Sequence, residues 1–94
     1  MDLGKSIKLC RVQKGWSQEQ LAAKTAISVS YLSLIEKNKR DPPLSTINKI
    51  ATALRVPLNV LMFLGAKPDE LSGMSKELRE KLAAASLKII AENG

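Results

Sequence analysis

The chain has 94 residues, 45% of them apolar, and a formal net charge of +6, which fits one soluble domain with a modest core and suggests a polyanionic partner. Its single cysteine and its lack of histidine exclude an internal disulfide, a cysteine–histidine zinc site and the usual general base, so no metal, cofactor or enzymatic activity is predicted. The N-terminus lacks a signal sequence and the longest strictly apolar run is Val60 to Leu64, so we expect a cytoplasmic protein without membrane association.

The first predicted element is an amphipathic helix at the N-terminus. Leu3, Ile7 and Cys10 recur at helical spacing and mark its apolar side. Gly15 follows as the left-handed residue that closes the helix. Cys10 is therefore expected to be a buried core residue rather than a reactive thiol.

Two short helices follow, joined by a tight turn. Ser17 and Gln20 have the spacing of a capping box, which opens a helix over residues 18–25. Ser28 offers a hydroxyl N-cap to the next helix, over residues 29–37. Such a pair is typical of a unit that lays one helix in a DNA groove, although two ordinary core helices of a small bundle have the same pattern.

The middle of the chain predicts two more helices. Asn38 tolerates positive φ and is a plausible stop for the preceding helix, and prolines keep the end of the following loop non-helical. Ser45 is expected to cap a fourth helix. Pro57 is expected to open a short fifth helix that runs to about Leu64.

The last part of the chain has a different character. Residues 1–67 carry eleven Lys/Arg and four Asp/Glu, whereas residues 68–94 carry four and five. After a linker at 66–75, Ser75 caps a helix over 76–94 that is apolar on nearly all sides, so one face can pack on its own domain while the other needs a partner. A helix that merely completes the monomer core is the alternative to a dimerisation helix. The residues predicted to form the dimer contact are Leu78, Leu82, Leu87, Ile89 and Ile90.

Three phrases in register carry a family resemblance: KGWSQEQLA, ISVSYLSLIEKNKRDPP and LSTINKIATALRVPLNVL. Together they resemble the DNA-binding domain of the phage-repressor/Cro family, also called XRE-like regulators. The resemblance implies an all-α fold, with a five-helix lambda-repressor-like domain over residues 1–65 and the C-terminal helix as an addition.

The resemblance also implies roles for individual residues. Arg11 and Glu36 resemble a structural ion pair between the first and third helices. The residues implied to contact bases are Val29, Ser30, Ser33 and Leu34, a chemically poor set in which the aliphatic side chains meet thymine methyl groups and the serines bond either base type. The residues implied to contact phosphates are Gln18, Tyr31, Lys37, Asn38, Lys39 and Arg40; for Tyr31, packing against the second helix is the alternative, and for residues 37–40 a solvated charge run.

Four positions depart from the family pattern. Ala26, Asn38 and Arg55 stand where the family often has glycine, so Ala26 either avoids positive φ or is strained. Cys10 stands where leucine is usual.

The predicted function is a sequence-specific transcriptional regulator, expected to be a repressor that binds a palindromic operator in double-stranded DNA as a homodimer. The alternative is an antitoxin-like or controller protein whose C-terminal helix binds a protein partner, with DNA binding in autoregulation.

Overall fold

The computed structural model describes residues 2–67, 69 and 73–92, without the side chains of residues 89–92. Every regular element in these ranges is a helix or a single helical turn, in agreement with the predicted all-α class. The α-helices are α1 (Leu3–Gln13), α2 (Gln18–Thr25), α3 (Val29–Glu36), α4 (Leu44–Leu54), α5 (Leu58–Gly65) and α6 (Lys76–Glu92).

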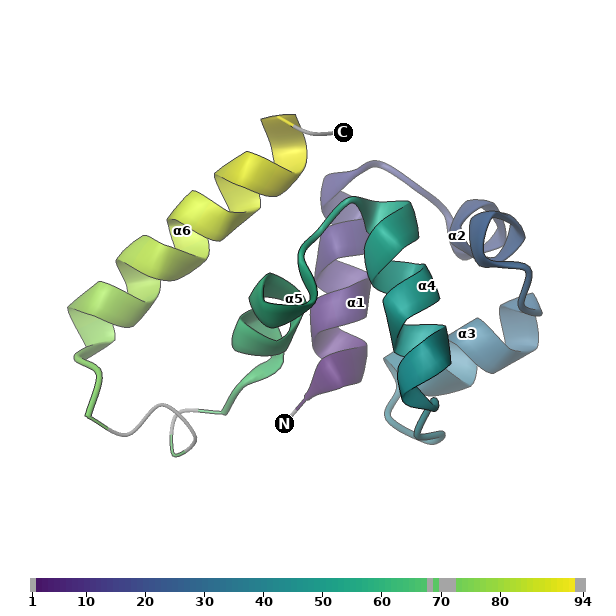
Figure 1. Cartoon of the computed structure of the whole chain (residues 1–94), viewed down its shortest axis with the longest axis horizontal. Coiled ribbons are helices and arrows are strands. Elements are labelled where there is room, and N and C mark those ends of the chain that lie inside the picture. Colours follow the sequence, from purple (N-terminus) through teal and green to yellow (C-terminus); the bar gives the residue numbers. More distant parts are fainter. Residues whose placement is uncertain (1, 68, 70–72, 93–94) are drawn as a thin grey trace.

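Helix α1 lies at the centre of the molecule. It contacts α5 on one side and α3 and α4 on the other, while α2 packs on α3 and α4 (Figure 1). Helix α6 lies outside this group of five helices, beyond the connection that follows α5, and packs on α1. The helix pair α2–α3 is thus held at one end of the domain and the tail at the other.

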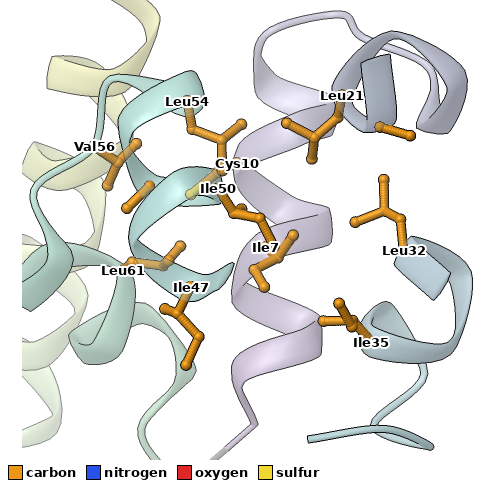
Figure 2. Close-up of a cluster of buried hydrophobic side chains, with 12 residues drawn as sticks. Ile7, Cys10, Leu21, Leu32, Ile35, Ile47, Ile50, Leu54, Val56 and Leu61 are labelled. Atoms are coloured by element: carbon orange, nitrogen blue, oxygen red, sulfur yellow. The ribbon is translucent and has the colours of Figure 1, made fainter. Parts of the chain in front are cut away.

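A single aliphatic core joins the first five helices. Ile7 of α1, Leu21 of α2, Leu32 of α3, Ile50 of α4 and Leu61 of α5 are fully buried and meet in it (Figure 2). Each such side chain contributes roughly 1.5–3 kcal/mol when it is removed from water. Leu32 and the α3 residue three positions later are both buried in this core, so that side of α3 faces inward. The opposite side is therefore its outward face.

The helix starts agree with the sequence analysis except at α4. Ser17 and Ser28 accept hydrogen bonds from the backbone N–H groups of Gln20 and Tyr31, so both predicted caps are confirmed. The prediction that Ser45 caps the fourth helix is wrong: α4 begins at Leu44, and its N-cap is Pro43.

Proline explains both this difference and the start of α5. Pro43 has the extended backbone of an N-cap (φ −64°, ψ 160°), and its carbonyl accepts from the N–H groups of Thr46 and Ile47. Pro57 stands in the same relation to α5, which begins one residue later. The proline ring restricts φ to values close to that of Pro43, so a helix can begin after it without a side-chain cap.

Cys10 is fully buried among the core side chains (Figure 2), as predicted. Burial is the main cause that raises the pKa of its thiol to about 11. The thiolate is the nucleophilic form of cysteine, so Cys10 is chemically inert in the folded protein at neutral pH.

No single helix among the described residues is long and apolar enough to span a membrane. Helices α4 and α5 reach that length and composition together, but they meet at a bend of 101°. Their apolar residues Ile50, Leu54 and Leu61 are buried in the core of the domain.

Among the residues that the structure describes, three other than glycine have left-handed backbones. Ala26, Asn38 and Arg55 have φ values of 55°, 57° and 56°, and Ala26 and Arg55 are the C-caps of α2 and α4. Of the two possibilities for Ala26, the structure has the strained one. A left-handed residue with a Cβ is disfavoured by roughly 1–2 kcal/mol, so the turn between α2 and α3 is held against a local cost.

We expect Ala26→Gly to raise the free energy of unfolding by about 0.5–1 kcal/mol, because glycine removes the strain but gains entropy in the unfolded chain. Urea denaturation measures the change. Ala23→Gly, three residues earlier on the exposed side of α2, is the matched control and should lower stability by about 0.5–1 kcal/mol. Equal losses in both variants would mean that Ala26 is not left-handed in solution.

Candidate nucleic-acid interface

A buried ion pair ties α1 to α3. Arg11 Nε donates to Glu36 Oε2 at 2.8 Å and Arg11 Nη2 donates to Glu36 Oε1 at 3.0 Å, which is the bidentate geometry that binds a carboxylate most strongly. The two side chains are only 11% and 2% exposed. The predicted pairing of Arg11 with Glu36 is therefore present.

The same two residues also hold the start of α2. Arg11 Nη1 donates to the backbone oxygen of Trp16 at 2.8 Å, which fixes the turn before α2. Gln18 Nε2 donates to Glu36 Oε1 at 3.1 Å. Glu36 thus accepts from two helices at once, and Gln18, at the first position of α2, is braced against α3.

The predicted base-contacting residues lie on one side of α3. Val29 and Leu34 are 37% and 36% exposed, Ser30 is exposed and Ser33 is half-buried. Ser30, Ser33 and Leu34 follow Val29 by one, four and five residues. All four therefore lie on adjoining rows of the helix, away from the buried Leu32. This outward face of α3, defined by Val29, Ser30, Ser33 and Leu34, presents two hydroxyls and two large apolar groups to solvent.

Basic residues follow directly after α3. Lys37, Lys39 and Arg40 are all exposed, and none of them forms an ion pair with a residue that the structure describes. Three cations beside the outward face of α3 make this loop a suitable contact for phosphates.

Tyr31 and Asn38 have structural contacts. Tyr31 is half-buried and packs against the core. Asn38 Oδ1 accepts from the N–H of Gly4 at 3.0 Å, and Asn38 Nδ2 donates to the carboxylate of Asp2. Both ends of the Asn38 amide are therefore occupied by the start of α1.

The contact between the start of α1 and the end of α3 is close. A Cβ at Gly4 would overlap the backbone oxygens of Ile35 and Glu36, so glycine is needed there. The hydrogen bond from Asn38 is the main cause that lowers the pKa of Asp2. This contact could not be predicted from the sequence, because its partners are more than thirty residues apart and lie in no motif.

A second basic group was also missed by the sequence analysis. Lys24 lies 4.7 Å from the centre of the Trp16 ring and Lys14 lies 6.0 Å from it, both within reach of a cation–π interaction. Both lysines, Trp16 and Arg55 line one cavity of about 390 Å³. Burial, and then the charge of Arg55, lower the pKa of Lys14. In the sequence, the single tryptophan, Trp16, is the only sign of this arrangement.

The described residues hold no group of three or more cysteine or acidic side chains that is placed to bind a metal ion. The chemistry of this surface is instead that of hydroxyl, apolar and cationic groups around one exposed helix.

Comparison with known proteins places residues 7–61 within the sequence pattern described as helix-turn-helix. The chain is 40% identical over 60 residues to the HTH-type transcriptional regulator SutR of Escherichia coli K12, covering 64% of this chain and 34% of SutR. It is 37% identical over 62 residues to the immunity repressor protein of Bacillus phage phi105, covering 66% and 43%.

A third relative extends into the tail. The HTH-type transcriptional regulator SlrR of Bacillus subtilis is 34% identical over 85 residues, covering 88% of this chain and 56% of SlrR. The chain thus spans between about a third and just over half of the length of these relatives. No solved structure matches it.

The ion pair generates a stability prediction. Arg11→Met leaves the Glu36 carboxylate buried without its partner and should lower the free energy of unfolding by about 3–5 kcal/mol. The double variant Arg11→Met/Glu36→Leu replaces both charges by apolar groups and should recover at least half of that loss. Urea denaturation of the wild type, both single variants and the double variant completes the cycle. Losses that simply add would contradict a coupled buried pair.

Proposed function

We propose that this chain, which belongs to the helix-turn-helix family of DNA-binding transcriptional regulators, represses transcription by binding a palindromic operator as a homodimer. Members of this family are not enzymes. A relative of similar sequence is named as an immunity repressor, which supports repression rather than activation. The proposed site of action is the compartment that holds the DNA.

The outward face of α3 is the observation that carries the proposal. Val29 and Leu34 keep over a third of their surface exposed, although removing apolar side chains from water is favourable. Methyl groups of thymine lie in the major groove, where an apolar side chain distinguishes them, and serine hydroxyls bond to any of the bases. We infer that Val29, Ser30, Ser33 and Leu34 read the operator.

Phosphate contacts would position that helix. Gln18 is held by Glu36 at the N-terminus of α2, where free backbone N–H groups favour an anion. The exposed cations Lys37, Lys39 and Arg40 follow the C-terminal end of α3. We assign these residues to the DNA backbone, and we assign Tyr31 and Asn38 mainly to holding the fold.

The proposed dimer contact lies on the tail. Leu78 and Leu82 of α6 are 46% and 40% exposed, whereas Leu87 packs against the core of its own chain. The side chains of Ile89 and Ile90 lie outside the described residues. We therefore place the contact on Leu78 and Leu82, within a division of the chain into a DNA-binding domain (1–65), a linker (66–75) and a tail (76–94).

The alternative function uses the same exposed leucines. An antitoxin-like or controller protein would use the face at Leu78 and Leu82 for a different protein and would bind DNA only to regulate its own gene. The two possibilities differ in what the tail contacts, so the oligomeric state of the isolated protein separates them.

The first test measures DNA affinity by fluorescence anisotropy on promoter fragments, including the promoter of its own gene. We expect affinity for the operator to exceed that for random DNA by about a thousandfold or more. With about four phosphates neutralised by each subunit, the log–log salt slope should be roughly −7. Discrimination below about tenfold on every fragment would defeat sequence-specific binding.

A variant links that test to α3. Leu34→Ser should weaken operator binding by about tenfold, the size of one lost base contact, and leave binding to random DNA unchanged. Val12→Ser changes a still more exposed apolar residue, on α1, and is the control; it should bind as the wild type does. Equal losses on operator and random DNA would remove Leu34 from the reading set.

The second test addresses the tail. The variant Leu78→Gln/Leu82→Gln removes two exposed apolar groups without disturbing the core, and Val12→Gln is its control. If the tail forms the dimer, sedimentation should show monomers and operator affinity should fall by about a hundredfold or more, because two linked sites become one. A variant that still dimerises and still binds the operator favours the partner-binding alternative.

A further inference from the structure

A cavity between the tail and the rest of the domain has the dimensions of a ligand site. Helices α1, α5 and α6 border an open cavity of about 490 Å³, a volume within the roughly 300–1,000 Å³ typical of small-molecule sites. Leu9, Phe63, Leu64 and Leu87 form apolar walls, with Leu9 from α1, Phe63 and Leu64 from α5 and Leu87 from α6. A space of this kind takes an apolar chain or ring.

Positive charge borders the same cavity. Lys5 of α1 and Lys76 and Arg79 of α6 line it, against one carboxylate, that of Glu80. The Lys76 Nζ and Glu80 Oε1 atoms are 4.0 Å apart and both side chains are largely exposed, so this pair is weak. The cavity therefore combines an apolar interior with a net positive border.

Arg79 adds an unsatisfied hydrogen-bond donor. Its Nε atom is buried and has no hydrogen-bond partner among the residues that the structure describes. A buried donor without an acceptor is costly, the more so on a charged group. This Nε atom is closed to solvent, but Arg79 also lines the cavity, so an anionic group bound there would pair with the charge of its guanidinium group.

We propose that this cavity binds an amphipathic anion, with its carboxylate at Arg79 and its hydrocarbon chain against Phe63 and Leu87. The apolar walls select the hydrocarbon part of such a ligand, and the net positive border selects its anionic head. A second copy of the chain is a poorer occupant, since the protein is itself basic, with a net charge of +6. Ligand binding here does not depend on the proposed function in DNA binding, so the two proposals fail separately.

Titration calorimetry of the full chain with decanoate, kept below its micellar concentration, tests the proposal. We expect saturable binding of one decanoate per chain and none of decyltrimethylammonium, which has the same chain and a cationic head. Arg79→Gln should weaken decanoate binding about tenfold or more. Lys88→Gln removes an exposed charge from the same helix outside the cavity and should stay within about twofold of the wild type.

A second variant acts by filling space. Ala83 also lines the cavity, and Ala83→Met keeps a good helix former while it occupies the apolar interior. It should weaken decanoate binding with an unchanged circular dichroism spectrum. Absence of saturable binding, or equal affinities in Arg79→Gln and Lys88→Gln, would overturn the proposal. So would a dimer that Ala83→Met weakens and decanoate does not displace, since a second copy would then fill the cavity.

Discussion

The buried pair of Arg11 and Glu36 is the interaction on which the arrangement of the first three helices depends. Hydrophobic burial is not directional, so the core alone would allow α3 to slide or rotate by a fraction of a turn. A bidentate pair between α1 and α3 removes that freedom because its geometry is narrow. Glu36 also accepts from Gln18, so one carboxylate sets the position of α2 relative to α3.

This constraint explains how a small domain presents one helix face with accuracy. Taking both charges out of water is expensive, and an apolar pair of similar size can be equally stable. The charged pair therefore contributes mainly to the specificity with which the helices are arranged, and less to the free energy of unfolding. The strained turn at Ala26 fits the same picture, because a left-handed residue with a Cβ persists only where the surrounding structure determines it.

Much of the fold could be predicted because its signals are local. Ser17 and Ser28 each act on a backbone N–H three residues away, and Asn38 ends its helix by its own φ. The start of α4 was mispredicted because the extended Pro43 competes with Ser45 for the N-cap, and both are common near helix starts. The residues of the outward face of α3 were implied by the family resemblance, and in the structure they lie opposite the buried Leu32.

Contacts between distant segments could not be predicted in this way. The bonds from Asn38 to Gly4 and Asp2, the stacking of Lys24 on Trp16 and the unpartnered Nε of Arg79 all depend on how separate helices meet. The tail shows the limit most clearly: two apolar faces were visible in the sequence, but only packing decides that Leu87 turns to the body while Leu78 and Leu82 remain exposed.

With so few hydrogen-bonding groups on α3, operator selection would rest on the pairing of two subunits and on DNA shape as well as on base contacts.

In the proposed interface, Glu36 holds α2 and α3 together, and the outward face of α3 contacts DNA. The decisive measurement follows the backbone amide shifts of the isotope-labelled protein while its own promoter fragment is added. We expect the largest changes at residues 29–40 and at Gln18, with little change along α1 or in the core. Changes confined to α6, or spread evenly over all basic residues, would contradict it.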